Sequence, residues 1–143
     1  MREILFRAKT TKKNNPNHAF DEKRVEGDLI RSGGKYYIHP TGNKVSVEGE
    51  LGKIIIMHEI DPDTICQFTG LTDKNGKEIW ENDIVRNEKG DIGVVQWFEE
   101  HAAFMIWNKT KHYICYLAEN DFSKIEIAGN EFDDPELLEV EYE

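Results

Sequence analysis

Histidines beside acidic residues are the first candidates for chemistry, because imidazole and carboxylate groups bind divalent metals and transfer protons. The stretch "MHEID" sets His58 next to Glu59 and near Asp61. A zinc-protease helix needs a second histidine four residues after the first, and the sequence has none there. We therefore predict no metal site and expect every histidine to be an exposed strand or loop residue: His18, His39, His58, His101 and His112.

The stretch "DKNGKE", from Asp73 to Glu78, is similar to the start of a calcium-binding EF-hand loop. It lacks the glycine required at the sixth position, which is Glu78, and the glutamate required at the twelfth, which is Ile84. We interpret Asp73–Gly76 as a tight turn, since Asn-Gly tolerates positive φ. We also expect an exposed turn before Ile84, with the Asp83 carboxylate capping its backbone.

Nucleophile and phosphate motifs give no further candidates. The sequence contains no Gly-x-Ser-x-Gly elbow, no Gly-Lys-Ser/Thr of a phosphate loop and no adjacent Cys–His pair. Cys66 and Cys115 lack partners at metal-ligand spacing, so we interpret them as free, small apolar residues in or near the core. We predict no catalytic residue, no cofactor and no enzymatic activity.

Aromatic residues concentrate between positions 97 and 116. Alternation along a strand directs one set of side chains to the core and the other set outward. An outward set would stack on a partner or be covered by self-association, whereas core filling is the alternative. We name Trp97, Trp107 and Tyr113 as a candidate interaction surface.

Net charge limits the class of partner. The 143 residues carry a formal charge of −10, yet residues 1–24 hold seven Lys or Arg against three acids. Residues 118–143 set ten carboxylates against one lysine. Such an acidic chain repels phosphate, which disfavours sequence-independent nucleic-acid binding, although a solubilising acidic surface explains the same composition.

The chain shows no sign of membrane insertion or export. Its apolar runs, such as residues 54–57, are far below the roughly 20 residues that cross a bilayer. Charges interrupt the first ten residues, so they do not form a secretory signal. We therefore expect a cytoplasmic protein that does not contact membranes.

Short strand patterns separated by polar turns run through the chain and predict a mainly β fold. We expect an N-terminal β region over residues 1–60, with a basic loop near 10–24. A hinge near "DPDTICQFTG" leads to a small antiparallel barrel with an acidic tail over residues 61–143. Pro135 predicts one short helical turn that brings Leu137 and Leu138 onto the sheet. The expected strands are 3–8, 24–30, 35–40, 44–49, 53–60, 78–85, 91–100, 102–108, 112–118 and 124–129.

Two segments, "DPDTICQFTGLTDKNGKEIWENDIV" and "IEIAGNEFDDPELL", resemble the YopX family of phage and prophage proteins of Gram-positive bacteria. That family reads Gln-Tyr-Thr-Gly-Leu-x-Asp-x-Asn-Gly, then Ile-Tyr-Glu-Gly-Asp-Ile-Val, and closes with Ile-Gly-Asn-x-x-Asp-x-Pro-Glu-Leu-Leu. The resemblance implies a mostly β protein with an SH3-type C-terminal half, and it supplies no catalytic residues. The matching positions are Gln67, Phe68, Thr69, Gly70, Leu71, Asp73, Asn75, Gly76, Ile79, Trp80, Glu81, Asp83, Ile84, Val85, Gly129, Asn130, Pro135, Glu136, Leu137 and Leu138.

This chain departs from the family at two places. Asn82 stands where the family has glycine, so that turn must accept a side chain. The basic stretch "TKKNNPNHAFDEK" replaces a shorter loop that ends in Trp-Val, and this chain has Arg24-Val25 there. The position of the second strand is therefore open.

Three functions follow as hypotheses. The first is a non-enzymatic, phage-encoded module that binds a protein through the aromatic face and acidic rim of the barrel, with a second copy of the chain as one alternative partner. The second is nucleic-acid association through the basic N-terminal segment and the aromatic strands. The third is an acidic nucleic-acid mimic that occupies a DNA-binding host protein.

Overall fold

The computed structural model describes residues 2–11, 24–40, 47–49, 52–54, 57–108 and 113–138, and the side chains of residues 47–49, 52–54 and 113 are outside that description. The centre of the basic loop, with His18, the acidic end after Leu138 and His112 therefore lie outside the described residues. The chain divides into two compact units, Met1–Gln67 and Phe68–Glu143. Sequence patterns place the division after residue 60.

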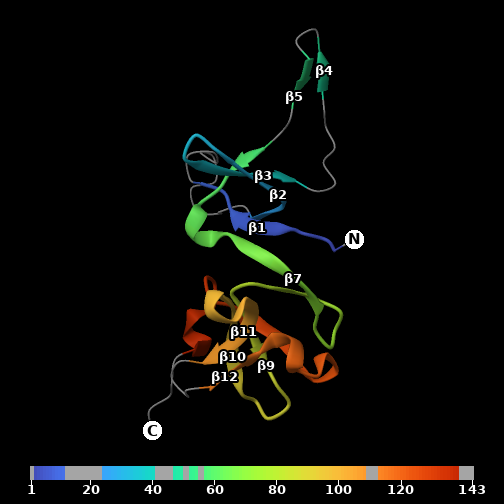
Figure 1. Cartoon of the computed structure of the whole chain (residues 1–143), viewed down its shortest axis with the longest axis vertical. Coiled ribbons are helices and arrows are strands. Elements are labelled where there is room, and N and C mark those ends of the chain that lie inside the picture. The colour runs from blue at the N-terminus through green and yellow to red at the C-terminus, as the bar shows by residue number, and fades with distance from the viewer. Residues whose placement is uncertain are drawn as a thin grey trace. The chain divides into compact units, whose positions relative to one another are not determined.

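The first unit is an antiparallel sheet in the order β6-β3-β2-β1-β7, with a separate two-stranded pairing of β4 and β5 (Figure 1). Strands β2 and β3 pair across the two-residue turn Gly33-Gly34, as antiparallel strands can, whereas longer segments separate the other strands of this sheet along the chain. The strands are β1 (Phe6–Lys9), β2 (Arg24–Ser32), β3 (Lys35–Pro40), β4 (Val47–Gly49), β5 (Gly52–Ile54), β6 (His58–Glu59) and β7 (Cys66–Thr72).

Alternating apolar residues build the core of this unit. Ala8, Val25, Ile38 and Ile60 are buried together. Strand β2 begins at Arg24, as the sequence predicts, in spite of the unusual loop before it. Gly27 allows β2 to approach β3 closely, because a Cβ at this position would lie 1.9 Å from the backbone oxygen of His39.

The predicted turn at Asp61 is confirmed as the 3-10 turn η2 (Pro62–Thr64), and the Asp61 carboxylate accepts a hydrogen bond from Asp63 N at 3.0 Å. The hinge predicted over residues 61–70 contains the division between the two units, which falls after Gln67. Beyond the turn its residues form β7, a strand that the turn signals do not predict. These residues alternate, with Cys66 and Phe68 buried and Gln67 half-buried, and this period of two is that of a strand.

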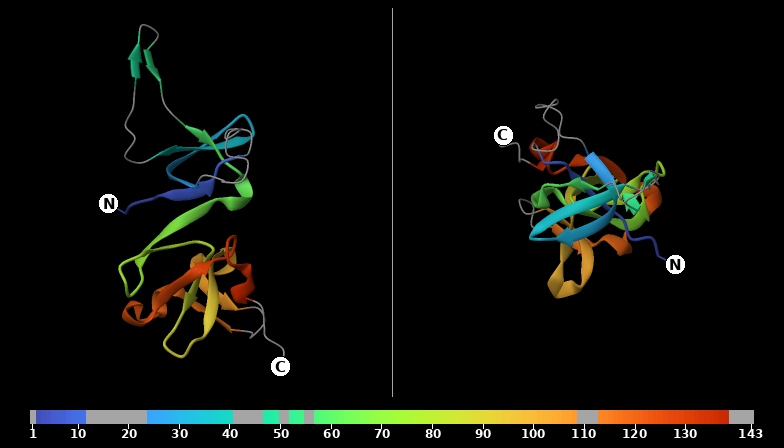
Figure 2. Two further views of the ribbon diagram at one scale, coloured as in Figure 1. Left: turned by 180° about the vertical axis from the view of Figure 1, so that it is seen from behind. Right: turned by 90° about the horizontal axis from the view of Figure 1, so that it is seen from above.

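The second unit contains a five-stranded antiparallel sheet in the order β12-β11-β10-β9-β13 (Figure 2). In addition, the end of β7 pairs with β8, through Phe68 with Trp80 and Thr72 with Glu78. The strands of this unit are β8 (Glu78–Trp80), β9 (Asp83–Arg86), β10 (Ile92–Phe98), β11 (Ala103–Asn108), β12 (Tyr113–Tyr116) and β13 (Glu126–Asn130).

The second core is aliphatic and lies on one face of this sheet. Alternate residues of adjacent strands supply it, so that Val95 of β10 lies opposite Ile106 of β11. Residues from turns complete the cluster, which confirms the predicted inward side of Ile125. Its buried members are Ile79, Val85, Val95, Ile106, Leu117 and Ile125.

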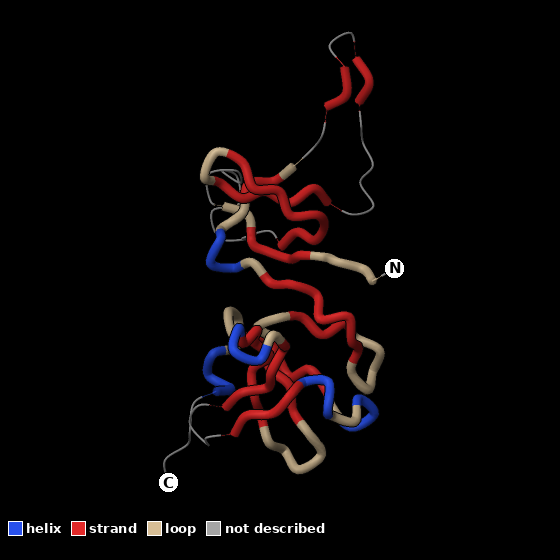
Figure 3. Tube along the Cα trace, in the orientation of Figure 1, coloured by secondary structure: helices blue, strands red, loops and turns tan. Residues whose placement is uncertain are grey.

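The mainly β prediction is confirmed, and every helical segment among the described residues is a short 3-10 turn (Figure 3). These are η2, η3 (Glu99–His101), η4 (Leu117–Glu119), η5 (Phe122–Lys124) and η6 (Pro135–Leu138). Turn η6 is the predicted C-terminal turn, and it contacts β10. Pairing of the described strands ends at β12 and β13 without closing a barrel. No helix in the described part of the chain is long and apolar enough to span a membrane.

Candidate functional site

The aromatic residues of the second unit occupy both faces of its sheet. The register of β10 and β11 pairs Trp97 with Phe104 and Phe98 with Ala103. Because consecutive residues of a strand face opposite sides, Trp97 and Phe98 point to different faces. Phe104 packs against the aliphatic core, so the face of Phe98 is the one turned away from that core.

We call the side chains of Phe98, His101, Trp107, Ile114 and Tyr116 the aromatic surface. Phe98 meets Trp107 edge to face with ring centroids 5.9 Å apart, and it stacks on His101 at 6.3 Å. His101 in turn meets Tyr116 at 5.6 Å, with 3.3 Å between His101 Nδ1 and Tyr116 Oη. Edge-to-face and offset contacts of this kind are favourable beyond the buried area. The four rings therefore support one another.

The side chains of the aromatic surface are at least partly exposed to solvent as well as fixed by these ring contacts. Ile114 lies opposite Trp107 in the register of β11 and β12, and it is 46% exposed. Tyr116 is 37% exposed, and Phe98 and Trp107 are half-buried. Isolated exposed apolar residues are normal, but a contiguous set held by ring contacts is typical of an interaction site.

The structure separates the residues that the sequence names as a surface. Trp107 belongs to the aromatic surface, whereas Trp97, 47% exposed, contacts Phe104 on the opposite face at 5.1 Å. Tyr113 begins β12, and its side chain is outside the described residues. Sequence reasoning missed His101 and Ile114. The turn over residues 99–102 would have indicated the pairing that aligns them with Phe98.

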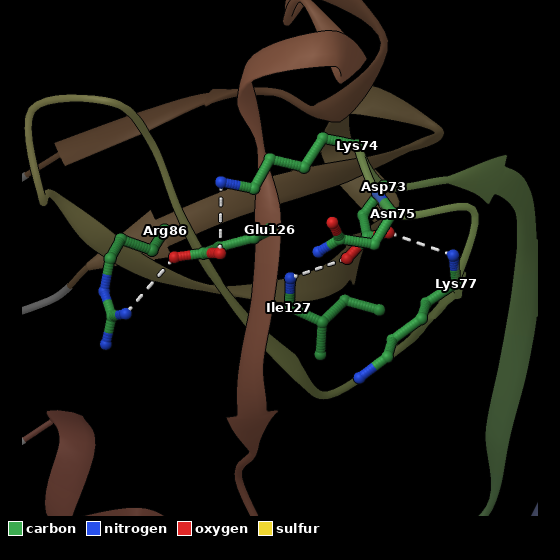
Figure 4. Close-up of polar contacts among 7 residues, drawn as sticks. All are labelled: Asp73, Lys74, Asn75, Lys77, Arg86, Glu126 and Ile127. Carbon is green, nitrogen blue, oxygen red and sulfur yellow. Dashed lines mark hydrogen bonds and ion pairs between the residues drawn. The ribbon is translucent and has the colours of Figure 1, made fainter.

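The Asp73 turn, residues 73–77, is the second polar feature of this unit (Figure 4). Asp73 is 5% exposed, and its Oδ1 accepts hydrogen bonds from Asn75 N at 2.8 Å and Lys77 N at 2.9 Å. Its Oδ2 accepts from Ile127 N of β13 at 3.0 Å, and Lys74 N donates to Ile125 O at 2.9 Å. The carboxylate therefore fixes the turn and holds β13 to it.

The same contacts determine the charge state of Asp73. Burial raises its pKa, but hydrogen bonds from the N–H groups of Ile127, Lys77 and Asn75, with the positive charge of Lys77, outweigh burial. The pKa of Asp73 is therefore below the ordinary aspartate value. Such a carboxylate stays ionised at neutral pH and is a structural acceptor rather than a proton donor.

The Glu126 carboxylate forms ion pairs with two cations beside the Asp73 turn. Its Oε2 lies 3.2 Å from Lys74 Nζ and its Oε1 lies 3.4 Å from Arg86 Nη1 (Figure 4). The hydrogen bond and charge of Lys74, followed by those of Arg86, lower the pKa of Glu126. All three side chains are partly exposed, so these pairs are worth little individually.

The turn before Ile84 differs from its predicted form. Asp83 is 3% exposed rather than exposed, and its Oδ2 accepts a hydrogen bond from Trp80 N at 2.8 Å. The predicted capping is thus confirmed, and the predicted exposure of this residue is wrong, because the cap is enclosed by buried Trp80 and Ile84. Asn82 has φ of 70°, the left-handed region that glycine adopts most easily.

No grouping of His, Cys, Asp and Glu within the described residues is suited to hold a metal ion. His39 and His58 are half-buried in β3 and β6 rather than exposed, whereas His101 is exposed in η3 as predicted. Cys66 is buried and Cys115 is half-buried.

Comparison with known proteins agrees with this architecture. The crystal structure of the yopX protein from Bacillus subtilis is similar with a TM-score of 0.51 and 15% sequence identity, covering 97% of this chain and 100% of that chain. At this identity the likeness concerns the fold alone. No curated protein matches the chain. The model of the YopX protein family matches residues 6–139, and the chain therefore belongs to the YopX family.

Proposed function

We propose that this chain is a non-enzymatic interaction module that binds a protein through the aromatic surface. The observation that supports this proposal is that the aromatic surface is both fixed and exposed. Its four rings hold one another in place through ring contacts, while Ile114 and Tyr116 remain open to solvent. Rigid aromatic side chains lose little entropy on binding, which makes them effective anchors.

The absence of enzymatic activity is part of this proposal. Among the described residues of the second unit, the buried carboxylates of Asp73 and Asp83 accept backbone hydrogen bonds. Such acceptors organise the fold, and the lowered pKa of Asp73 does not suit a general acid or base, which must be poised near neutral pH.

The cellular setting that we propose follows from the family resemblance: a phage or prophage product that works in the cytoplasm of its bacterial host. We also propose an SH3-type barrel for the second unit, supported by five short antiparallel strands and an interior of alternating apolar residues. The partner is a protein, or a second copy of the chain, and not a membrane.

Affinity capture from phage-infected cells with matched variants tests the function. Ile114→Ser alters the aromatic surface, and Ile4→Ser alters an isoleucine of nearly equal exposure, 48%, in the first unit. A protein retained by the wild type and by Ile4→Ser, but lost with Ile114→Ser, supports the proposal. Equal retention by all three refutes it.

The alternative functions have distinct results in parallel assays. Light scattering at several concentrations detects self-association through the surface. A gel shift with oligonucleotides at low salt tests nucleic-acid binding, and salt-sensitive recovery of host DNA-binding proteins tests the acidic mimic. Either nucleic-acid result without dependence on Ile114 contradicts a function based on the aromatic surface.

A further inference from the structure

Three exposed carboxylates border one end of the aromatic surface. Glu99 and Glu100 lie in η3, the turn that also holds His101, and Glu119 lies in η4, which directly follows Tyr116. All three are exposed, and none forms an ion pair within the described part of the chain. These acids are therefore available to a partner.

Strand β12 gives the aromatic surface an edge. It is the terminal strand of the five-stranded sheet, and one side of its backbone faces away from β11. Protected edges carry lysine, proline or a bulge, whereas β12 reads Tyr-Ile-Cys-Tyr. Its last carbonyl, Tyr116 O, accepts a hydrogen bond from Asn120 Nδ2 at 2.9 Å, so a peptide would pair with the residues before it. An extended peptide that adds to such an edge gains main-chain hydrogen bonds and places alternate side chains on one face.

Charge selects among the possible occupants of this edge. A second copy of the chain would bring together two molecules of net charge −10, and like charges oppose association. A cationic side chain is favoured twice, because it pairs with the carboxylates and is attracted to the faces of Tyr116 and Trp107. The acidic border thus fits a basic segment.

We propose that the partner contributes an extended segment bearing arginine or lysine, which pairs along β12 and places a cation between the aromatic surface and the carboxylates of Glu99, Glu100 and Glu119. This inference rests on the proposed function and names the chemical class of its partner. Binding of this kind weakens with added salt, since exposed charges are screened.

A display library of random twelve-residue peptides, selected on the full chain, tests the proposal directly. Enriched peptides should carry arginine or lysine among strand-forming residues. Replacing the enriched arginine by citrulline, which keeps the shape and removes the charge, should weaken binding about tenfold. The triple variant Glu99→Gln, Glu100→Gln, Glu119→Gln should lose a similar factor, and hydrogen exchange should show new protection in β12.

Control variants separate this inference from the function on which it rests. Peptides that lose binding with Ile114→Ser, but lack cations or tolerate citrulline, overturn the cationic segment and leave the interaction module standing. Three other results overturn the cationic segment as well: peptides that bind Ile114→Ser and Ile4→Ser equally, a library that yields no enriched peptide, and a surface that is covered by self-association. The capture experiment then decides the proposed function separately.

Discussion

The Asp73 carboxylate should be the most important polar group for the stability of the second unit. Asparagine at this position keeps the Oδ1 acceptor for Asn75 N and Lys77 N. Its NH₂ group replaces Oδ2 and faces Ile127 N, so two hydrogen-bond donors point at each other and no bond forms. The hydrogen bond to Ile127 spans 54 positions of sequence, so its loss removes one of the contacts that hold β13 to the turn. We expect Asp73→Asn to weaken folding more than its small change in shape suggests.

The magnitude follows from the three hydrogen bonds. A bond to a charged acceptor contributes about 1.5–3 kcal/mol, and water can replace the Asn75 and Lys77 bonds at the surface more easily than the half-buried Ile127 bond. We therefore expect Asp73→Asn to lower the free energy of unfolding by about 1.5–3 kcal/mol, and Asp73→Ala by about 2.5–4 kcal/mol.

Urea unfolding followed by tryptophan fluorescence measures this unit, because Trp80, Trp97 and Trp107 all belong to it. Asp121→Asn is the matched control: Asp121 accepts hydrogen bonds only from Ser123, two residues away, and it is exposed. If Asp73→Asn and Asp121→Asn unfold at the same urea concentration, the reasoning about Asp73 is wrong.

Acid provides a second measure of the same group. The pKa of Asp73 is lower in the folded chain than in the unfolded chain, so its contribution is complete above the ordinary aspartate range and disappears as the pH falls through the lowered value. The difference in unfolding free energy between wild type and Asp73→Asn should be largest at neutral pH and shrink on acidification. A difference that is constant with pH contradicts an ionised Asp73.

Three further changes have defined outcomes. Gly27→Ala forces a Cβ to within 1.9 Å of a β3 backbone oxygen, so circular dichroism melts should show that the free energy of unfolding falls by about 3 kcal/mol or more. Gly33→Ala is the control: it has only an unfavourable positive φ to accommodate, and it should lower the free energy of unfolding by about 1 kcal/mol. Asn82→Gly should be more stable than Asn82→Ala by about 1 kcal/mol, because the left-handed backbone suits glycine; fluorescence-detected melts that rank alanine above glycine contradict this. An NMR titration should find the pKa of Glu126 below its ordinary value, and Lys74→Gln should raise it; an unchanged value contradicts the assigned cause.

Local patterns were sufficient to predict most of the fold. Strand β3 begins at Lys35 and ends at Pro40 as expected, because two glycines precede it and its apolar residues alternate. Strand β7 was missed because Asp61-Pro62 is a strong turn signal, and the signal was extended too far. Closure of the predicted barrel depends on pairing between distant strands, which alternation alone does not determine.

The candidate site was harder to predict because it depends on register. Whether Trp97 or Phe98 shares a face with Trp107 is decided by the turn over residues 99–102, and a shift by one residue exchanges the faces. Each aromatic residue was identified from its type, but their grouping required the pairing of β10 with β11. The contributions of His101 and Ile114 were invisible for the same reason.

The residues that identify the family maintain the fold. In the first motif Asp73 fixes a turn, Ile79 and Ile84 are fully buried, and Asp83 caps Trp80. In the second, Asn130 Oδ1 accepts hydrogen bonds from the N–H groups of residues 132 and 133.

By contrast, the aromatic surface, Phe98, His101, Trp107, Ile114 and Tyr116, lies between the two motifs and matches neither. A scaffold held by buried acceptors and aliphatic residues accepts different side chains on its exposed strands with little cost to stability, as surface substitutions generally do. The motif therefore predicts how a member of this family folds. What each member binds should be sought on β10, β11 and β12, by exchanging those exposed residues between members and measuring whether the partner changes with them.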